Sequence, residues 1–399
     1  MVPVGNGEEP NYDAASSLLF TEETTFGKSE QLNTSTETLT SSQLHAPPPP
    51  TLPFDLVIEV LCRLPVRLLL KLQCLCKSWK SLISDPKFAK KNLHMATKRH
   101  HLIVSSTNSV DEILFFDSPI PSVLSTCVTQ TQLSYPISLR NTKPLAMCSC
   151  DGIICITLFN NSALLWNPSI QKFKMLPPLK SNQQKSVLDI SYSFGYDHFI
   201  DSYKIVSNSY LVNNNEVSVY TLGVDNWRRI QDIPYTCVST SGVFVSGTVN
   251  WLAYDPLSHS SSRAIVSLDL DKETYQEISQ PDLVKDRWTL GVLNDSLCIF
   301  ASSYMFLDVW IMKEYGNKDS WTKLYNIPYI DRGSYTYAKV LYISEDDQML
   351  MDVYDLGINK LKLVVYDSKN GIFYIPEIQN TNCWINPKVY VESLISPCL

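Results

Sequence analysis

The sequence predicts an α+β chain in three parts: a tail without fixed structure, a small helical module and a large all-β domain. Residues 1–50 are rich in Ser, Thr, Glu and Asn and end in four prolines. Apolar residues then recur at helical spacing as far as Pro86, and from about residue 101 short β-branched and aromatic runs alternate with turn residues. A length of 399 residues also exceeds what one hydrophobic core usually fills.

The first part, residues 1–50, has a composition that cannot bury enough apolar surface to offset chain entropy. Its last four residues, Pro47–Pro50, favour a stiff polyproline II spacer. We therefore expect a disordered tail closed by this spacer. A short signalling peptide within the tail is the alternative.

Cysteine usage and hydropathy indicate where the protein resides. The eleven cysteines are an odd number without regular spacing, which favours a reducing compartment. The N-terminus lacks the basic and then apolar regions of a secretory signal, and no stretch offers 18 uninterrupted apolar residues. We therefore expect a cytoplasmic or nuclear protein, or one present in both compartments, with no membrane contact.

The second part, residues 51–97, has the periodicity of two or three short helices. Asp55 can cap or favour a helix N-terminus, and Pro65 breaks the first helical segment. The apolar positions recur at spacings of three and four: Val57, Leu61 and Leu64, then Leu68, Leu72, Leu75, Trp79 and Leu82.

This helical module carries more apolar residues than one helix stripe requires. The additional ones are Leu56, Ile58, Val60, Leu69, Leu70, Cys74, Cys76 and Ile83. A bundle of about 40 residues cannot bury that much against itself. We expect another surface to cover the excess, either the adjoining domain of this chain or a separate partner protein. If a separate partner covers it, Leu61 and its neighbours should be exposed in the free chain.

The third part, residues 100–397, repeats one unit: an apolar or aromatic pair, a polar turn, and a strand that runs toward a proline. The clearest copy is Leu165-Trp166-Asn167-Pro168 followed by Phe173-Lys174-Met175-Leu176-Pro177. The anchors of the copies are Phe116, Trp166, Tyr220, Leu268, Trp310 and Tyr366, separated by 50, 54, 48, 42 and 56 residues. In five copies an aromatic residue follows the anchor: Phe173, Trp227, Tyr275, Trp321 and Phe373.

A period of about 50 residues matches a four-stranded propeller blade of the kelch type, which predicts an all-β propeller of about six blades. A β-sandwich with periodic turns is the alternative. A propeller must join its two ends, and the run Val389–Ile395 alternates as a strand should. We expect this run to pair, within one blade, with the earliest strand near Leu102-Ile103-Val104.

The helical module closely resembles the F-box. The resemblance covers about 40 residues and rests on Leu52-Pro53, on Leu64-Pro65-Val66 twelve residues later, on Cys76-Lys77-Ser78-Trp79 and on Ser84-Asp85-Pro86-Lys87-Phe88. It implies a three-helix module that docks on the Skp-type adaptor of a cullin-based ubiquitin ligase. The sequence departs from the family pattern at Leu68, where members often have a polar residue, and near Lys71-Leu72, where a basic-aromatic pair is frequent.

By position, the resemblance assigns eleven residues to the adaptor-docking surface or its immediate support. They are Leu52, Pro53, Leu56, Ile58, Leu61, Leu64, Pro65, Leu72, Cys76, Trp79 and Ile83.

The repeat domain is similar, more loosely, to the F-box-associated repeat domain common in plants. The matching segments are Trp166-Asn167-Pro168-Ser169 and Tyr390-Val391-Glu392-Ser393-Leu394. Together the two resemblances imply a non-catalytic substrate-recognition subunit of a Skp-cullin-F-box ubiquitin ligase, with a target protein bound by the repeat domain through residues that the sequence does not identify. The alternatives are a scaffold without ubiquitin transfer, and a propeller lectin or enzyme.

Other partners and chemistries have weaker support. Residues 51–100 contain ten Lys or Arg against three Asp or Glu, yet no aromatic stacking array accompanies them, so we expect no nucleic-acid binding. Cys74-x-Cys76 and Cys148-x-Cys150 lack zinc spacing and are expected to be buried apolar residues. We expect no cofactor or metal, a solvated turn at Asp346-Asp347 and a surface pair at His100-His101.

Overall fold

The computed structural model describes residues 53–107, 112–125, 127–134, 144–179, 187–211, 215–237, 241–254, 263–282, 287–303, 305–329, 335–355, 360–378 and 386–398. The predicted tail and spacer at residues 1–50 lie outside the described residues, and so does Leu52. Their structure and role remain predictions.

The helical module contains α1 (Phe54–Leu61), α2 (Val66–Leu72), α3 (Lys77–Ile83) and α4 (Pro86–Met95). Prolines precede α1 and α2 directly and open α4, where the missing N–H has no intrahelical partner to lose. Asp55 lies in the first turn of α1 and makes no cap hydrogen bond. Asp85 caps α4 instead, because its Oδ1 accepts a hydrogen bond of 2.7 Å from the Lys87 N–H. The first three helices follow the sequence prediction, and the fourth begins where the predicted pattern ends.

The β domain forms six antiparallel sheets in the described residues, which we number as blades along the chain. Blade 1 contains β25 (Asn386–Val391), β1 (His100–Thr107), β2 (Ile113–Pro119) and β3 (Thr131–Leu133), with α5 (Ile120–Val123) after β2. Blade 2 contains β4 (Pro144–Cys150), β5 (Ile153–Leu158), β6 (Ala163–Asn167) and β7 (Lys172–Met175). Blade 3 contains β8 (Val187–Asp197), β9 (Ser202–Leu211), β10 (Asn215–Thr221) and β11 (Trp227–Arg229).

The remaining blades follow in the same order. Blade 4 contains β12 (Thr236–Cys237) and β13 (Val243–Val245), which both pair with β14 (Thr248–Tyr254), then β15 (Arg263–Asp269) and β16 (Tyr275–Ile278). Blade 5 contains β17 (Trp288–Leu293), β18 (Ser296–Ser302), β19 (Phe306–Met312) and β20 (Trp321–Pro328), with the 3-10 turn η2 (Lys318–Ser320) before β20. Blade 6 contains β21 (Tyr335–Ile343), β22 (Gln348–Asp355), β23 (Lys360–Asp367) and β24 (Ile372–Tyr374).

The blades form a closed propeller, because the innermost strands contact one another in a ring: β25, β4, β8, β13, β17 and β21. This arrangement confirms the propeller and its six blades and excludes the β-sandwich. Buried apolar side chains fill the space between each pair of neighbouring blades. The core of the protein is therefore six interblade layers rather than one central cluster.

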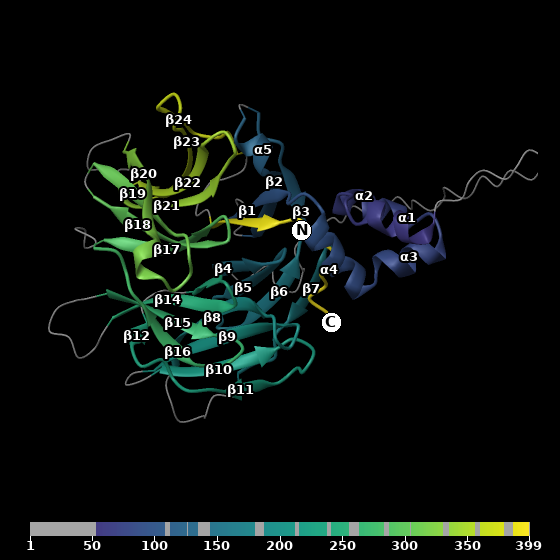
Figure 1. Cartoon of the computed structure of the whole chain (residues 1–399), viewed down its shortest axis with the longest axis horizontal. Helices are drawn as coiled ribbons and strands as arrows, with labels where there is room; N and C mark the ends of the chain where they lie inside the picture. The colour runs from purple at the N-terminus through teal and green to yellow at the C-terminus, as the bar shows by residue number, and fades with distance from the viewer. Residues whose placement is uncertain are drawn as a thin grey trace, which may run out of the picture. The chain divides into compact units, whose positions relative to one another are not determined.

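The two ends of the propeller join in blade 1, as the sequence predicts. The C-terminal strand β25 pairs antiparallel with β1, with Val389 opposite Leu102 and Lys388 opposite Ile103. In Figure 1 the yellow C-terminal strand lies beside the blue β1. One blade is thus built from both ends of the β domain, and neither end can leave without opening the ring.

The repeating unit of the sequence corresponds to the two outer strands of each blade. All six anchors lie on the third strand of their blades. In four blades the anchor pairs with the aromatic residue seven positions later: Trp166 with Phe173, Tyr220 with Trp227, Leu268 with Tyr275, and Tyr366 with Phe373. Blade 5 differs, because the longer connection of residues 313–320, which includes η2, places Trp321 opposite Met312. A β-bulge beside Trp310 then shifts the register farther along the same pair of strands.

The turns of these outer hairpins share a backbone feature. Five residues after the anchor the chain adopts a positive φ, at Gln171, Asp225, Glu273 and Gly371. Asp269 and Asp367 close their turns by accepting hydrogen bonds from two following backbone N–H groups, which is the local bonding that Asp and Asn favour in turns.

Candidate functional site

The helical module has a small core, which is continuous with a buried layer of the propeller. Buried side chains from all four helices and the α1–α2 turn form it: Leu61, Cys62, Val66, Leu69, Ile83, Phe88 and Ala89. Asn92 of α4 holds the α1–α2 turn by hydrogen bonds. Its Nδ2 donates to the carbonyl oxygens of Cys62 at 2.9 Å and of Leu64 at 3.2 Å. The position of the α1–α2 turn is therefore fixed by α4.

Outside this core, the first three helices expose an unusual amount of apolar surface. We call this the apolar surface of α1–α3. Its exposed side chains are Phe54 at 58%, Leu56 at 51%, Val60 at 59%, Leu68 at 39% and Leu75 at 69%. Single exposed apolar residues are ordinary, but five within 22 positions of a short module are typical of a surface that another protein covers.

The sequence-predicted site residues fall into three groups. Leu61 and Ile83 are buried at 3% and 1% exposure. The partly buried residues are Ile58, Leu64, Pro65, Leu72 and Trp79. The exposed ones are Pro53, Leu56 and Cys76, whereas Leu52 lies outside the described residues.

The expectation that Leu61 is exposed in the free chain is wrong. Leu61 packs in the core of the module, and Leu68 and Leu75, which were expected on the same stripe as Leu72, point to solvent. Leu61 packs with Val66 and Leu69, which form the buried side of α2, so Leu68 faces away from this side. Leu75 lies in the break at residues 73–76 between α2 and α3, where the helical phase does not continue. Sequence reasoning therefore missed Phe54, Leu68 and Leu75 as surface residues.

Charged and polar groups border the apolar surface. The carboxylate of Glu59 in α1 forms ion pairs with Lys91 of α4 at 3.0 Å and with Arg63 at 3.3 Å. The hydrogen bond from Lys91, followed by that from Arg63, lowers the pKa of this carboxyl. Cys76 precedes α3, where the Ser78 hydroxyl and the Trp79 backbone N–H lower the pKa of its exposed thiol. Cys74 is also exposed, so the expectation that the Cys74-x-Cys76 pair is buried is wrong.

Ion pairs attach the helical module to the propeller. Lys90 pairs with Asp201 and Lys98 with Asp295, both at 2.6 Å. Asp201 and Asp295 lie in turns that join the innermost strand of a blade to the second strand. We call the end of the propeller that carries these turns the helix-side face.

A buried carboxylate in blade 1 adds a further contact. Asp117 lies 3.0 Å from the His101 Nδ1, accepts a 2.9 Å hydrogen bond from the Tyr390 hydroxyl and lies 3.6 Å from Arg67 of α2. His101 is only 7% exposed, so the predicted surface pair at His100-His101 is wrong for this residue. Asp117 therefore connects β1, β2 and β25 with the helical module.

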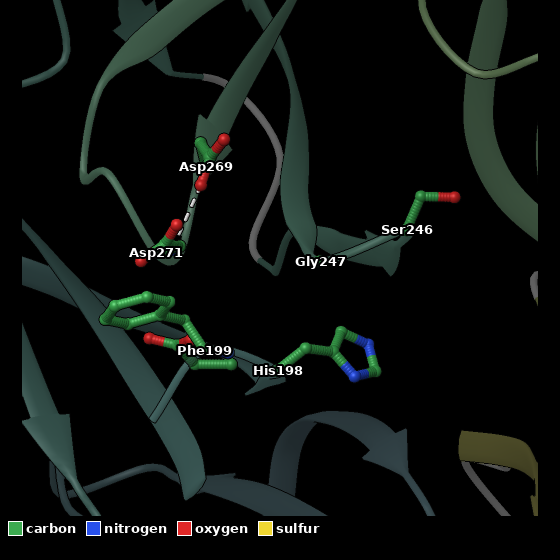
Figure 2. A pocket seen from close by; sticks show the side chains of 7 residues that line it. His198, Phe199, Ser246, Gly247, Asp269 and Asp271 are labelled. Atoms are coloured by element: carbon green, nitrogen blue, oxygen red, sulfur yellow. Dashed lines mark hydrogen bonds between the residues drawn. The ribbon is translucent and has the colours of Figure 1, made fainter. Parts of the chain in front are cut away.

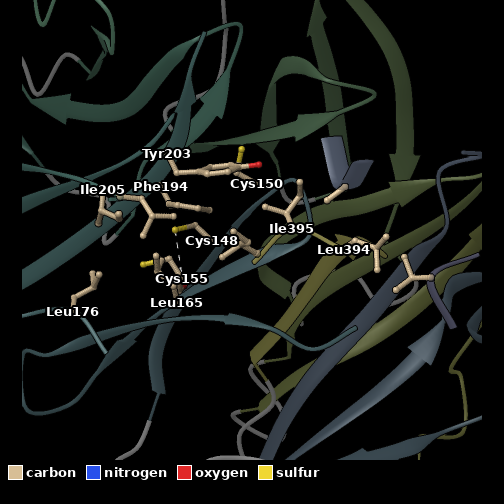
Figure 3. Close-up of a cluster of buried hydrophobic side chains, with 14 of the residues drawn as sticks. Cys148, Cys150, Cys155, Leu165, Leu176, Phe194, Tyr203, Ile205, Leu394 and Ile395 are labelled. Carbon is tan, nitrogen blue, oxygen red and sulfur yellow. Dashed lines mark hydrogen bonds between the residues drawn. The ribbon is translucent and has the colours of Figure 1, made fainter. Parts of the chain in front are cut away.

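After β25 the chain crosses from blade 1 to blade 2 and continues the core there. Leu394 and Ile395 belong to the same buried cluster as Cys148, Cys150 and Leu165 (Figure 3). The Cys148-x-Cys150 pair is thus buried, as predicted. This cluster extends to the core of the helical module, so that one apolar layer joins blades 2 and 3 to α1–α4.

A depression of about 350 Å³ lies on the helix-side face, between turns of blades 3 and 4 (Figure 2). It is lined by Asp197, His198, Phe199, Ser246, Gly247, Asp269 and Asp271.

Within the described ranges, no three His, Cys, Asp or Glu side chains are arranged to hold a metal ion. Asp346 and Asp347 occupy the β21–β22 turn, with Asp346 mostly exposed. Among helices in the described residues, none has the length and apolar character needed to span a bilayer.

Comparison with known proteins assigns both parts of the chain. Residues 50–91 match the F-box domain, and residues 95–397 match the F-box associated β-propeller domain. The F-box/kelch-repeat protein At3g23880 of Arabidopsis thaliana is 29% identical over 383 residues, covering 88% of this chain and 96% of that protein. The F-box protein CPR1 of the same plant is 24% identical over 381 residues, covering 87% and 89%. The chain therefore belongs to the F-box-associated β-propeller family and carries an F-box before its propeller.

Proposed function

We propose that this chain is a substrate-recognition subunit of a Skp-cullin-F-box ubiquitin ligase. The F-box binds a Skp-type adaptor, and through it a cullin, while the propeller holds a target protein. The chain contributes proximity and no bond-making groups: it brings target lysines close to a ubiquitin-charged conjugating enzyme held elsewhere in the complex.

The observation that carries this proposal is the apolar surface of α1–α3. The exposed side chains of Phe54, Leu56, Val60 and Leu75 cannot pack into the module, because its core is already filled by other residues. Burying such side chains against a partner stabilises a complex by about 1.5 to 3 kcal/mol each before ordering costs. An adaptor that offers an apolar groove is the partner that fits.

The placement of the helices supports a target site on the face of the propeller opposite to them. Ion pairs and the C-terminal segment occupy part of the helix-side face, so we assign the target to the opposite face of the propeller. That face carries the β5–β6 turn, whose Phe159 side chain is 72% exposed. Exposed aromatic residues of this kind are frequent anchors of protein interfaces.

Co-purification with a Skp-type adaptor tests the first half of the proposal. Wild type should retain the adaptor, and Leu56→Asp and Leu75→Asp should weaken its binding about tenfold or more, because each places a charge in an apolar interface. Phe199→Asp is the matched control, since Phe199 is 79% exposed on the propeller. Leu61→Asp is unsuitable, because a charge in the core would unfold the module.

Two results would overturn the adaptor proposal: a wild-type chain that does not retain the adaptor, or surface variants that bind as well as wild type while melting normally. A ubiquitination assay with a reconstituted ligase then distinguishes a ubiquitin ligase subunit from a scaffold. Target captured by the propeller should acquire ubiquitin, and Phe159→Ala should reduce target capture without changing adaptor binding. Capture without ubiquitin transfer would support the scaffold alternative.

A further inference from the structure

Two lysines lie on neighbouring innermost strands at the axis of the propeller. Lys339 belongs to β21 of blade 6 and Lys388 to β25 of blade 1, and these strands contact each other in the inner ring. The stem of Lys339 reaches toward β17 of blade 5, where a Cβ added to Gly291 would stand 3.1 Å from the Lys339 Cε. The charge of Lys388 acts on Cys148 of β4 in blade 2. The pair thus faces four consecutive blades.

Neither lysine has a partner for its charge among the residues the structure describes. The cross-strand neighbour of Lys339 is Asp352, which interacts with it electrostatically but forms no ion pair within 4.0 Å. Among the residues that the structure describes, the Cys148 thiol is the only titratable group that acts on the pKa of Lys388. A lysine that is fully buried almost always has a counter-charge. Both of these side chains are partly exposed, so that solvent and small solutes can reach them.

Further polar groups on the strands beside Lys339 lack hydrogen-bond partners within the described part of the chain. They include the Thr289 hydroxyl on β17 and Oδ1 of Asp352. Thr289 lies two residues before Gly291, so both project from the same face of β17, the one that the Lys339 stem approaches. A neutral donor therefore lies on the face of β17 that Lys339 approaches.

Burial affects the charges of this group. It lowers the pKa of Lys339 to about 8, with a contribution from the positive charge of Lys388, and also lowers the pKa of Lys388. The same cause raises the pKa of Asp352 to about 7, so this carboxyl is protonated in about half of the molecules at neutral pH and offsets the positive charge of Lys339 only in part. The other titratable groups that act on the pair are the thiols of Cys148 and Cys298.

We propose that Lys339 and Lys388, with the Thr289 hydroxyl, form a binding site for a small oxyanion of the phosphate or carboxylate type at the propeller axis. The anion supplies the negative charge that the protein does not, and lysine ammonium groups bind phosphate as point charges. Two cations on different blades hold one ligand, so binding also ties blade 6 to blade 1, where the ring closes. The proposal does not depend on adaptor binding.

Calorimetric titration of the full chain with inorganic phosphate and, separately, with citrate tests the site at constant ionic strength. Wild type should bind at least one of the two, and which one binds distinguishes the phosphate from the carboxylate type. Lys388→Met and Lys339→Met should each weaken binding by about tenfold to a hundredfold, the loss of one charge-assisted hydrogen bond. Lys172→Met is the matched control, since Lys172 is exposed on β7 and its loss should leave binding unchanged.

Melting temperatures in anion-free buffer accompany the titration and report folding. Both axis variants should melt at or above the wild-type temperature, because each removes a partly buried positive charge that forms no ion pair within the described residues. Absence of phosphate and citrate binding to wild type would overturn the proposal. Equal binding to wild type and to a folded Lys388→Met variant would also overturn it, since the anion would then bind elsewhere.

Discussion

Asn167 and Ser393 lie 226 positions apart in sequence and are joined by hydrogen bonds in the folded chain. The buried Nδ2 of Asn167 reaches the Ser393 carbonyl at 3.1 Å, the Ser393 hydroxyl at 3.1 Å and the Ile395 carbonyl at 2.8 Å. The Ser393 hydroxyl in turn donates to the Asp151 carbonyl at 2.7 Å. The two segments that resemble the F-box-associated family are therefore the two halves of one contact, which holds the C-terminal segment on blade 2.

Replacing Asn167 should destabilise the propeller. In Asn167→Ala the buried carbonyls of Ser393 and Ile395 lose their donor, and we expect the free energy of unfolding to fall by about 3 kcal/mol. Urea unfolding measures the loss. Asn317→Ala, which removes turn hydrogen bonds at an exposed position, should cost less than about 1 kcal/mol. Equal losses for the two variants would show that the contact contributes little.

Gly152 is required by the same contact for steric reasons. It has a φ of +81°, and an added Cβ would lie 2.3 Å from the Ser393 Oγ and 2.5 Å from the Val391 carbonyl oxygen. Gly223 has a φ of +90° with open space around it, so Gly223→Ala measures the backbone strain alone, about 1 kcal/mol. Gly152→Ala should cost about 1 to 3 kcal/mol more in urea unfolding, because the C-terminal segment must move. Similar losses of unfolding free energy in the two variants would show that the C-terminal segment can shift away from Gly152 at little cost.

The repeat could be predicted from the sequence because its chemistry is local. An aromatic or apolar anchor, a polar turn and an aromatic partner seven residues later form one hairpin, and Trp166 with Phe173 is the clearest example. Blade 5 departs from this spacing because residues 313–320, which include the turn η2, lengthen the connection between its outer strands. Strand pairing between β25 and β1 was also predictable, since a propeller has to close.

The exposure of the helical residues could not be predicted in the same way. Leu75 would continue the stripe of Leu68 and Leu72 only if a single helix ran through residues 73–76, and the chain turns there instead. Within α2 the buried side carries Val66 and Leu69, so that Leu68 is exposed. The burial of His101 depends on Asp117 and Tyr390, which come from two other strands. Such contacts between distant segments leave no periodic signal in the sequence.

Removal of the closing strand should disrupt the propeller as a whole. A chain that ends at residue 385 lacks β25, so β1 loses its inner partner and the interblade layers beside blade 1 are opened. We expect the cooperative thermal transition to be lost. A chain that ends at Ile395 keeps β25 and the Asn167 contacts and should still melt cooperatively. A normal transition in the shorter chain would show that five blades and a partial sixth are stable without closure.

Asp352 should make the stability of the propeller depend on pH. Its pKa is raised to about 7 by burial, whereas an unfolded chain has an Asp pKa of roughly 3.9. Between these values the folded state binds one more proton than the unfolded state, so this group's contribution to stability falls as pH rises from about 4 to about 7 and stays constant above.

Asp352→Asn removes this titration and tests it. The variant should match wild type near pH 4 and exceed it above pH 7 by on the order of 2 to 4 kcal/mol, reduced by whatever attraction to Lys339 the carboxylate provides. Urea unfolding at pH 4.5 and 7.5 measures the difference. Asp346→Asn is the control, because Asp346 is largely exposed in a turn and its replacement should shift both values equally. A variant that gains nothing at pH 7.5 would mean that Lys339 already compensates the buried carboxylate.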